Sequence, residues 1–224
     1  MIWRTAKGFY LLTIIFIILN TIGCSRDLSR RYTYPVKKRG VYHIVKKGDT
    51  LWRISNHYHV DIEDIAKANR IYNPKKLAVG QKLFIPRASS SAPPKSVHTS
   101  KIEDFIWPVK GEVVSRFGKK LLKKNNGIDI RTEEGSDIIA IASGRVIFSE
   151  RGPDGYGKMI IIKHTGGFVS LYANNNENLV QMNQYVSQGQ RIARAGIPKN
   201  SNKPILHLEI RKNRIPKNPL YYLP

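Results

Sequence analysis

The sequence is short of cysteine, of acidic residues and of long apolar runs. Cys24 is the only cysteine among 224 residues, so no disulfide can form within the chain. The apolar run over residues 9–19 is much shorter than the roughly 20 residues that a membrane-spanning helix needs. Asp and Glu number 16 against 38 Lys and Arg, which gives a net charge of +22. Such a surface attracts anionic partners, which include nucleic acid, anionic lipid and anionic wall polymers.

The N-terminus has the pattern of an export signal, because basic residues precede the apolar run. Residues 21–24 read Thr-Ile-Gly-Cys, which resembles the lipobox of bacterial lipoproteins, with Thr21 where leucine is usual. We therefore expect a lipoprotein signal peptide over 1–23 and lipidation of Cys24; the alternative is an incidental thiol. By analogy with Gram-negative sorting, Ser25 points to the outer membrane. Export does not fit a nucleic-acid role, so we expect no nucleic-acid partner.

Two polar segments divide the rest of the chain. Residues 24–41 are basic and have no apolar period, which indicates a lipidated tether beside anionic headgroups or a solvated spacer. Residues 87–104 are rich in Ser and Pro, which is the composition of a linker. The two segments leave candidate domains at 42–86 and 105–224.

The 42–86 segment has the pattern of a strand, two helices and a second strand. Apolar and polar residues alternate over 42–46, as in a short strand. A Gly-Asp-Thr turn over 48–50 precedes apolar residues at helical spacing, and a second helix is expected from about Asp61. Residues 81–86 form the closing strand.

Residues 42–52, YHIVKKGDTLW, and 77–86, LAVGQKLFIP, resemble the opening and the close of a LysM domain. LysM domains bind N-acetylglucosamine-containing glycans, chiefly peptidoglycan and chitin, in a shallow groove between two loops. The resemblance implies that the glycan contacts come from Gly48, Asp49, Thr50, Leu51, Asn69, Ile71 and Leu77. Each also has a structural alternative, because Asp49 or Thr50 can serve only as a helix cap and the two leucines only as core.

Residues 105–224 are rich in β-strand patterns separated by glycine-containing turns, and no helical period is sustained. We predict strands over 113–117, 138–149, 158–164, 168–173, 186–195 and 205–211. Strands linked in this way favour an antiparallel β domain.

Residues 105–111, FIWPVKG, 140–146, AIASGRV, and 206–210, LHLEI, resemble the M23, or LytM-type, metallopeptidase domain. The resemblance covers essentially all of 105–224. The expected fold class is therefore multidomain, with a small βααβ LysM domain followed by a mainly antiparallel β LytM/M23-like domain.

The chemistry of that family is incomplete here. Active members take two zinc ligands from H-x-G-x-D and a third from the second His of H-x-H. Residues 125–129 read NNGID, so Asn125, a poor zinc ligand, replaces one His and Asp129 remains. The Tyr-Ala-His segment, which carries a catalytic His, ends in Asn174, and H-x-H has Ile205 before His207. We predict no metal, no cofactor and no catalytic residue, so the domain is expected not to be an enzyme.

The order of lipoprotein signal, LysM domain, linker and degenerate LytM domain resembles the NlpD type of murein hydrolase activator. This implies that the old groove binds the regulatory helix of a periplasmic N-acetylmuramoyl-L-alanine amidase and so turns on septal peptidoglycan cleavage. Contact would come from Asn125, Asp129, Asn174, Ile205 and His207. The alternatives are a passive peptidoglycan-binding tether and a weak zinc endopeptidase with a rearranged metal site.

Overall fold

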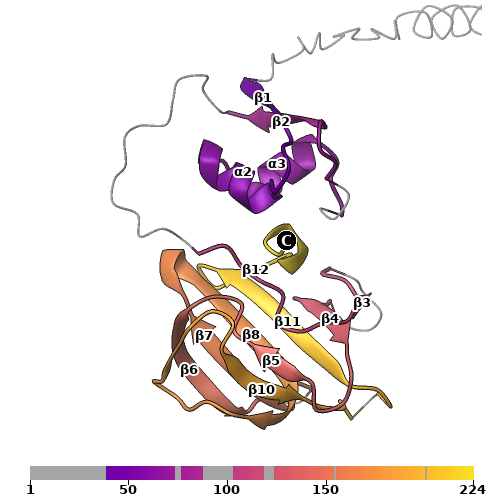
Figure 1. Cartoon of the computed structure of the whole chain (residues 1–224), viewed down its shortest axis with the longest axis vertical. Coiled ribbons are helices and arrows are strands. Elements are labelled where there is room, and N and C mark those ends of the chain that lie inside the picture. The colour runs from indigo at the N-terminus through magenta and orange to yellow at the C-terminus, as the bar shows by residue number, and fades with distance from the viewer. Residues whose placement is uncertain (1–38, 74–76, 88–102, 119–123, 154, 200) are drawn as a thin grey trace, which may run out of the picture. The chain divides into compact units, whose positions relative to one another are not determined.

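The structure is a computed structural model that describes residues 39–73, 77–87, 103–118, 124–153, 155–199 and 201–224 (Figure 1). The chain divides into units over 1–37 and 38–224, and the first lies wholly outside the described residues. The expected signal peptide, Cys24 and most of the tether and linker lie outside them too. No helix in the described part is both long and apolar enough to span a membrane.

Residues 40–86 fold as a strand, two helices and a strand. The elements are β1 (Gly40–Ile44), α2 (Leu51–Tyr58), α3 (Ile62–Ala68) and β2 (Lys82–Pro86). β1 and β2 pair antiparallel over their whole length. This order confirms the βααβ fold expected from the sequence.

Local sequence determines where both helices begin. The Thr50 hydroxyl caps α2 by accepting a hydrogen bond from the backbone N–H of Arg53 at 3.1 Å. The Asp61 carboxylate caps α3 by accepting one from the N–H of Glu63 at 2.8 Å. These bonds satisfy donors that a helix start leaves without partners. The apolar side chains at helical spacing are buried together with those of β2, namely Leu51, Ile54, Ile62, Ile65, Leu83 and Ile85.

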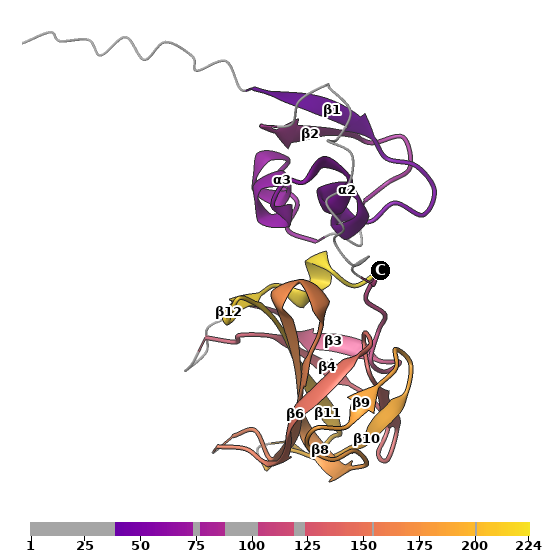
Figure 2. The ribbon, with the colours of Figure 1, turned by 90° about the vertical axis from the view of Figure 1, so that its left-hand side faces the viewer.

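Ten further strands in the described residues form one sheet. They are β3 (Glu112–Ser115), β4 (Ile128–Arg131), β5 (Asp137–Ile139), β6 (Gly144–Arg151), β7 (Lys158–Lys163), β8 (Phe168–Asn178), β9 (Tyr185–Val186), β10 (Arg191–Ala195), β11 (Ile205–Lys212) and β12 (Ile215–Lys217). The main order is β3-β4-β11-β8-β7-β6-β9, β10 pairs with β5 and β8, and β12 pairs with β11. All these pairs are antiparallel, which confirms the predicted class. Figure 2 shows that the strands do not lie in one flat layer.

The predicted strands differ from the observed ones where small residues interrupt a run. The strand predicted over 138–149 is two strands, β5 and β6, because the chain turns at 140–143. The strand predicted over 186–195 likewise divides into β9 and β10 around Gly189, whose φ is 78°. β4 and β12 were not predicted, because runs of four and three residues are too short to show a period. A short 3-10 helix, Pro219–Tyr221, follows β12.

The alternation of β11 separates a core face from a second face that carries polar groups. Leu206, Leu208 and Ile210 are at most 1% exposed and belong to the core. The residues between them point to the opposite face, as successive strand residues do, and these are Ile205, His207, Glu209 and Arg211. The register with β4 places His207 directly opposite Asp129. Two segments far apart in the sequence are thereby brought together at one place on the sheet.

His164 is buried in a polar cluster of its own. Its Nδ1 lies 2.9 Å from the Ser143 carbonyl oxygen and its Nε2 lies 2.7 Å from the Ser170 hydroxyl. Ser170 also contacts the Tyr172 hydroxyl at 3.1 Å, and that hydroxyl accepts the backbone N–H of Ile141 at 2.9 Å. Burial lowers the pKa of His164 more than its polar neighbours raise it. The folded protein therefore holds His164 in its neutral form near neutral pH.

We expect this histidine to make the fold less stable in mild acid. The pKa of His164 is lower in the folded than in the unfolded chain. The contribution of His164 to the free energy of unfolding is therefore complete above the unfolded pKa of about 6.5 and decreases as the pH drops through that value. We expect the free energy of unfolding, measured with urea, to fall more steeply between about pH 7 and about pH 5 for the wild type than for His164→Gln. Equal slopes for two folded proteins would contradict a buried, neutral His164.

Candidate functional site

Three residues of the expected glycan groove line one cavity of about 460 Å³. They are Asn69, Ile71 and Leu77, and Tyr72 lies beside them in the same wall. Tyr72 is 81% exposed, so its ring is available to a ligand. A tyrosine offers both an apolar face and a polar tip, which suits a sugar with its alternating C–H and O–H groups. Tyr72 had no role assigned from the sequence, although an aromatic residue in a polar loop is a usable signal.

The side chain of Asn69 is committed to holding the fold. Its Nδ2 donates to the Ile65 carbonyl at 2.8 Å and to the Phe84 carbonyl at 2.7 Å. Its Oδ1 accepts the Phe84 N–H at 2.7 Å. Both amide protons are thereby used to tie the end of α3 to β2. Asn69 shapes the cavity, and the other lining residues are better placed to contact a glycan.

The strand-to-helix turn places the other four expected glycan residues, Gly48, Asp49, Thr50 and Leu51. Asp49 Oδ2 accepts the Lys46 N–H at 2.7 Å and lies 2.9 Å from His43 Nε2. Burial raises the pKa of Asp49, but these two partners outweigh burial and lower it. Leu51 is 1% exposed, so its side chain is core and a glycan contact would have to come from its backbone. None of these four lines the cavity beside Tyr72.

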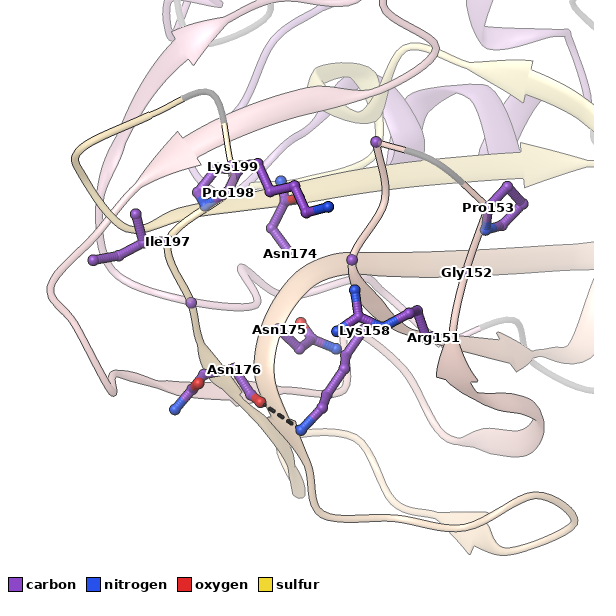
Figure 3. Close-up of a pocket in the computed structure, with 13 residues that line it drawn as sticks. Arg151, Gly152, Pro153, Lys158, Asn174, Asn175, Asn176, Ile197, Pro198 and Lys199 are labelled. Carbon is purple, nitrogen blue, oxygen red and sulfur yellow. Dashed lines mark hydrogen bonds between the residues drawn. The ribbon is translucent and has the colours of Figure 1, made fainter.

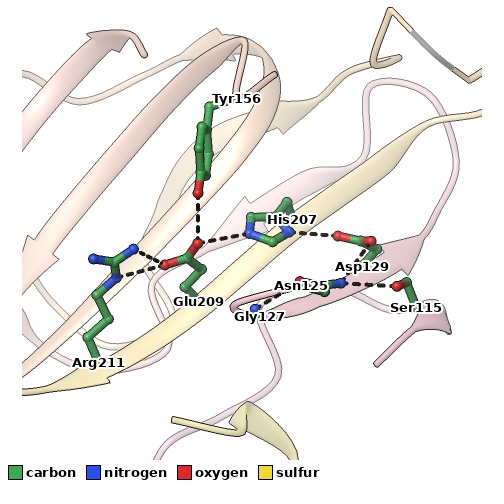
Figure 4. Close-up of polar contacts among 8 residues, drawn as sticks. All are labelled: Ser115, Asn125, Gly127, Asp129, Tyr156, His207, Glu209 and Arg211. Atoms are coloured by element: carbon green, nitrogen blue, oxygen red, sulfur yellow. Dashed lines mark hydrogen bonds and ion pairs between the residues drawn. The ribbon is translucent and has the colours of Figure 1, made fainter. Parts of the chain in front are cut away.

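The degenerate peptidase site is built around His207 on β11. Its Nδ1 lies 2.6 Å from Asp129 Oδ1 on β4, and its Nε2 lies 3.2 Å from Glu209 Oε1 on β11 (Figure 4). Burial lowers the pKa of His207, but hydrogen bonds and charge attraction to both carboxylates outweigh burial and raise it to about 9. At neutral pH both ring nitrogens therefore donate, and His207 is a cation held between two anions.

Glu209 extends this set of contacts, although it has no solvent exposure. Its Oε2 accepts from Arg211 Nε at 2.7 Å, and its Oε1 accepts the Tyr156 hydroxyl at 3.0 Å. Burial raises the pKa of Glu209, but His207 and Arg211 together lower it, so it stays ionised. Tyr156, Glu209 and Arg211 had no role assigned from the sequence. Glu209 lies two residues and Arg211 four residues after His207 on one strand, and this alternation is the signal that could have found both.

Asn125 occupies the position of the first zinc ligand in the family pattern. Its Nδ2 donates to Asp129 Oδ2 at 3.1 Å and to the Ser115 hydroxyl at 3.0 Å. Its Oδ1 accepts the Gly127 N–H at 2.9 Å. The amide oxygen is the only atom of this side chain able to bind a metal, and here it is used by the backbone. We call Asn125, Asp129, Tyr156, His207, Glu209 and Arg211 together the His207 network.

Asn174 reaches this region through a bulge in β8. Opposite β7, Lys158 pairs with Asn175 and Met159 with Ala173, so Asn174 is the extra residue. Its φ of 64° is in the left-handed region, which asparagine tolerates better than most residues. A bulge re-aims a side chain relative to its neighbours. Asn174 is therefore displaced from the His207 network and lines an adjoining pocket.

Ile205, the fifth expected groove residue, lies on the polar face of β11, two residues from His207. It is half-buried and pairs with Arg131 of β4. The structure thus brings Asn125, Asp129 and His207 into direct hydrogen-bonded contact, and it places Ile205 and Asn174 beside them without such contacts.

A peptidase zinc site does not fit these residues. Such a site needs three protein ligands and one open position for water. Here His207 and Asp129 are engaged with each other, Asn125 presents N–H groups toward Asp129, and Ile205 has no ligand atom. Among the described residues, no three or more His, Cys, Asp or Glu side chains are grouped so as to hold a metal ion.

Comparison with protein families matches two models to this chain. Residues 43–86 match the LysM domain, and residues 123–219 match peptidase family M23. Both matches fall on the segments whose folds are described above.

Three curated proteins are similar to this chain. An uncharacterized lipoprotein, YgeR, of Escherichia coli K12 is 31% identical over 97% of this chain and 94% of its own length. A lipoprotein NlpD/LppB homolog of Pseudomonas aeruginosa is 30% identical over 81% of this chain and 76% of its own. The murein hydrolase activator NlpD of E. coli K12 is 42% identical over 56% of this chain, which covers only 33% of that longer protein.

The presence of Asn125 at the first zinc-ligand position of the family predicts how this site responds to zinc. We expect Asn125→His to gain a third ligand, so that after dialysis against zinc it retains up to about one ion per chain, whereas the wild type retains much less. Asn126→His is the matched control, because it adds a histidine one residue away from the ligand position. Metal analysis of the three proteins decides the matter, and stoichiometric zinc in the wild type would contradict the argument.

Proposed function

Because the chain belongs to the NlpD/LppB family of lipoproteins with LysM and M23 domains, we propose that it activates a peptidoglycan hydrolase without itself being an enzyme. The hydrolase is a periplasmic N-acetylmuramoyl-L-alanine amidase. Activation leads to septal peptidoglycan cleavage and separation of daughter cells. Cys24 carries the lipid that anchors the chain, in the outer membrane, facing the periplasm.

One observation carries this proposal. The M23 fold is intact around β4, β8 and β11, but its reactive positions hold Asn125, Asn174 and Ile205, and the remaining His207 and Asp129 bind each other. A fold that keeps these strands while its remaining polar side chains bond to one another can bind a chain without attacking it. A relative at 42% identity that is named a murein hydrolase activator supports the same conclusion.

The groove would act by competing for a segment of the amidase. A regulatory helix that covers the zinc site of the amidase binds instead to the face of β11 that carries Ile205 and the His207 network. Ile205 gives this face an apolar contact where the peptidase family has a histidine, and helices dock through apolar side chains. Removal of the helix opens the zinc site of the amidase to peptidoglycan.

The LysM domain holds the chain on peptidoglycan, which is the substrate of the amidase. The cavity lined by Tyr72, Ile71 and Leu77 supplies the glycan contact, and the high positive charge of the chain adds long-range attraction to anionic wall polymers. The lipid anchor and the glycan contact together hold the LytM domain near the wall.

We expect the full chain, purified in detergent, to release dye from labelled peptidoglycan only when an amidase of the same cell is also present with zinc. Ile205→Glu should reduce that stimulation by roughly tenfold or more, because a buried carboxylate would oppose an apolar contact. Ile215→Glu is the matched control, since Ile215 on the neighbouring strand β12 is 60% exposed.

The outcomes of this assay are distinct. Release by the chain alone that His207→Ala abolishes would show a peptidase and overturn the proposal. Binding to peptidoglycan with no stimulation of any amidase of that cell would show a passive tether. Equal losses for the two isoleucine variants would remove the β11 face from the mechanism.

Glycan binding should depend on Tyr72. We expect Tyr72→Ala to lower the amount of chain that sediments with purified peptidoglycan by roughly fivefold, because an exposed ring on a sugar face contributes about 1 kcal/mol. Tyr42→Ala is the control, because Tyr42 is 61% exposed and does not line the cavity. Unchanged sedimentation of the Tyr72 variant would place the glycan elsewhere.

A further inference from the structure

A pocket of about 860 Å³ lies beside the His207 network, and its walls are cationic (Figure 3). It is formed by the turn between β6 and β7, the bulge of β8 and the residues after β10. Its described polar side chains are three cations and three amides, namely Arg151, Lys158, Lys199, Asn174, Asn175 and Asn176. This volume is in the range of sites that enclose a small ligand or part of a peptide.

The cations of this pocket are not neutralised by the part of the chain that the structure describes. No Asp or Glu is among the described lining residues. Arg151 and Lys158 lie directly opposite each other in the β6–β7 pair. Like charges in that position repel and destabilise the sheet. An anion bound between the two cations would therefore reduce this repulsion. Within the described residues, Lys158 Nζ donates to the Asn176 carbonyl at 2.9 Å and forms no ion pair with a carboxylate.

The pocket also contains an acceptor without a donor. Asn175 is 6% exposed, and its Nδ2 donates to Asn178 Oδ1 at 2.8 Å. Its Oδ1 is buried and has no hydrogen-bond partner. A buried acceptor left without a donor is costly. A ligand that carries an N–H group as well as a negative charge therefore matches this pocket better than a simple inorganic anion.

The pocket and the His207 network meet at Tyr156. The glycines on both sides of Tyr156 line the pocket, and the Tyr156 carbonyl accepts the Asn174 N–H at 2.8 Å. The Tyr156 hydroxyl donates to Glu209 in the His207 network. A peptide lying on β11 can therefore extend one side chain into the pocket.

We propose that this cationic pocket is a carboxylate subsite that receives an acidic side chain, with its adjoining backbone N–H, from the amidase segment bound in the groove. The inference rests on the proposed function, because it specifies the chemistry of the same partner. It adds a charge requirement to the apolar contact at Ile205. An amidase whose regulatory segment lacks an acidic residue at the matching position would be a poor partner.

The test uses the full chain and two labelled peptides. One is an alanine-based helical peptide that carries glutamates, and the other has glutamine at each glutamate. The pocket variant is Arg151→Gln with Lys158→Gln. The matched control is Arg145→Gln with Lys163→Gln, because these two cations form the same kind of cross-strand pair in the same hairpin and do not line the pocket. Fluorescence anisotropy at low and high salt measures binding, and circular dichroism confirms that each variant is folded.

We expect the wild type to bind the glutamate peptide roughly tenfold more tightly than the glutamine peptide at low salt, and the preference to vanish in the pocket variant but not in the control. Equal losses in both double variants would reduce the effect to general surface charge and overturn the subsite. Displacement by a disaccharide-tetrapeptide together with no preference for the glutamate peptide would assign the pocket to peptidoglycan and also overturn it.

Amidase stimulation separates this inference from the proposed function. If the wild type stimulates the amidase and the pocket variant does so equally well, the result contradicts the subsite and leaves the activator function unaffected. Absence of stimulation by the wild type would sink the activator, and with it the amidase as the partner. Stimulation lost in the pocket variant and kept in the control supports both.

Discussion

The structure of the site depends on keeping the charge of Glu209, which has no solvent exposure, compensated. A buried carboxylate is tolerated only when donors surround it. Arg211 and His207 supply positive charge from the same strand, and Tyr156 supplies a hydroxyl from the turn before β7. Removing any one of these would leave a buried charge short of a partner, so the four side chains are fixed as a unit. At neutral pH His207 is therefore a cation, and it would have to lose a proton to bind a metal ion.

This constraint explains how the fold persists at a site that lacks a full set of zinc ligands. The register of β11 with β4 places His207 beside Asp129 through backbone hydrogen bonds, and that register is set by the buried Leu206 and Leu208. Asn125 replaces a metal–ligand bond by hydrogen bonds to Asp129 and Ser115. Side chains that would converge on an ion thus converge on one another. The core of the sheet therefore holds the backbone of this site in place without an ion.

The sequence predicted the parts of this arrangement that follow from period and motif. The sequence predicted a strand over 205–211, and the family pattern predicted that Asn125, Asp129 and His207 lie together. Burial of Glu209 could not be predicted, because a charged residue at an alternating position is usually exposed. The displacement of Asn174 depends on a bulge, which is a property of the pairing with β7 and not of the local sequence. The pairing of Arg151 with Lys158 could not be predicted either, because it depends on the register between β6 and β7.

The burial of Glu209 and the displacement of Asn174 determine which contacts the proposed groove can make with another molecule. Within the His207 network every charge has a partner, so its polar groups add little attraction and mainly define a surface. In the part of the chain that the structure describes, cations without an acidic partner are found instead at Arg151 and Lys158, and an apolar side chain is found on β11, at Ile205. A partner that satisfies both must have an apolar face and an acidic residue in a fixed order along its chain. Such an asymmetric surface selects the direction in which a segment binds, which a uniformly polar or uniformly apolar groove cannot do.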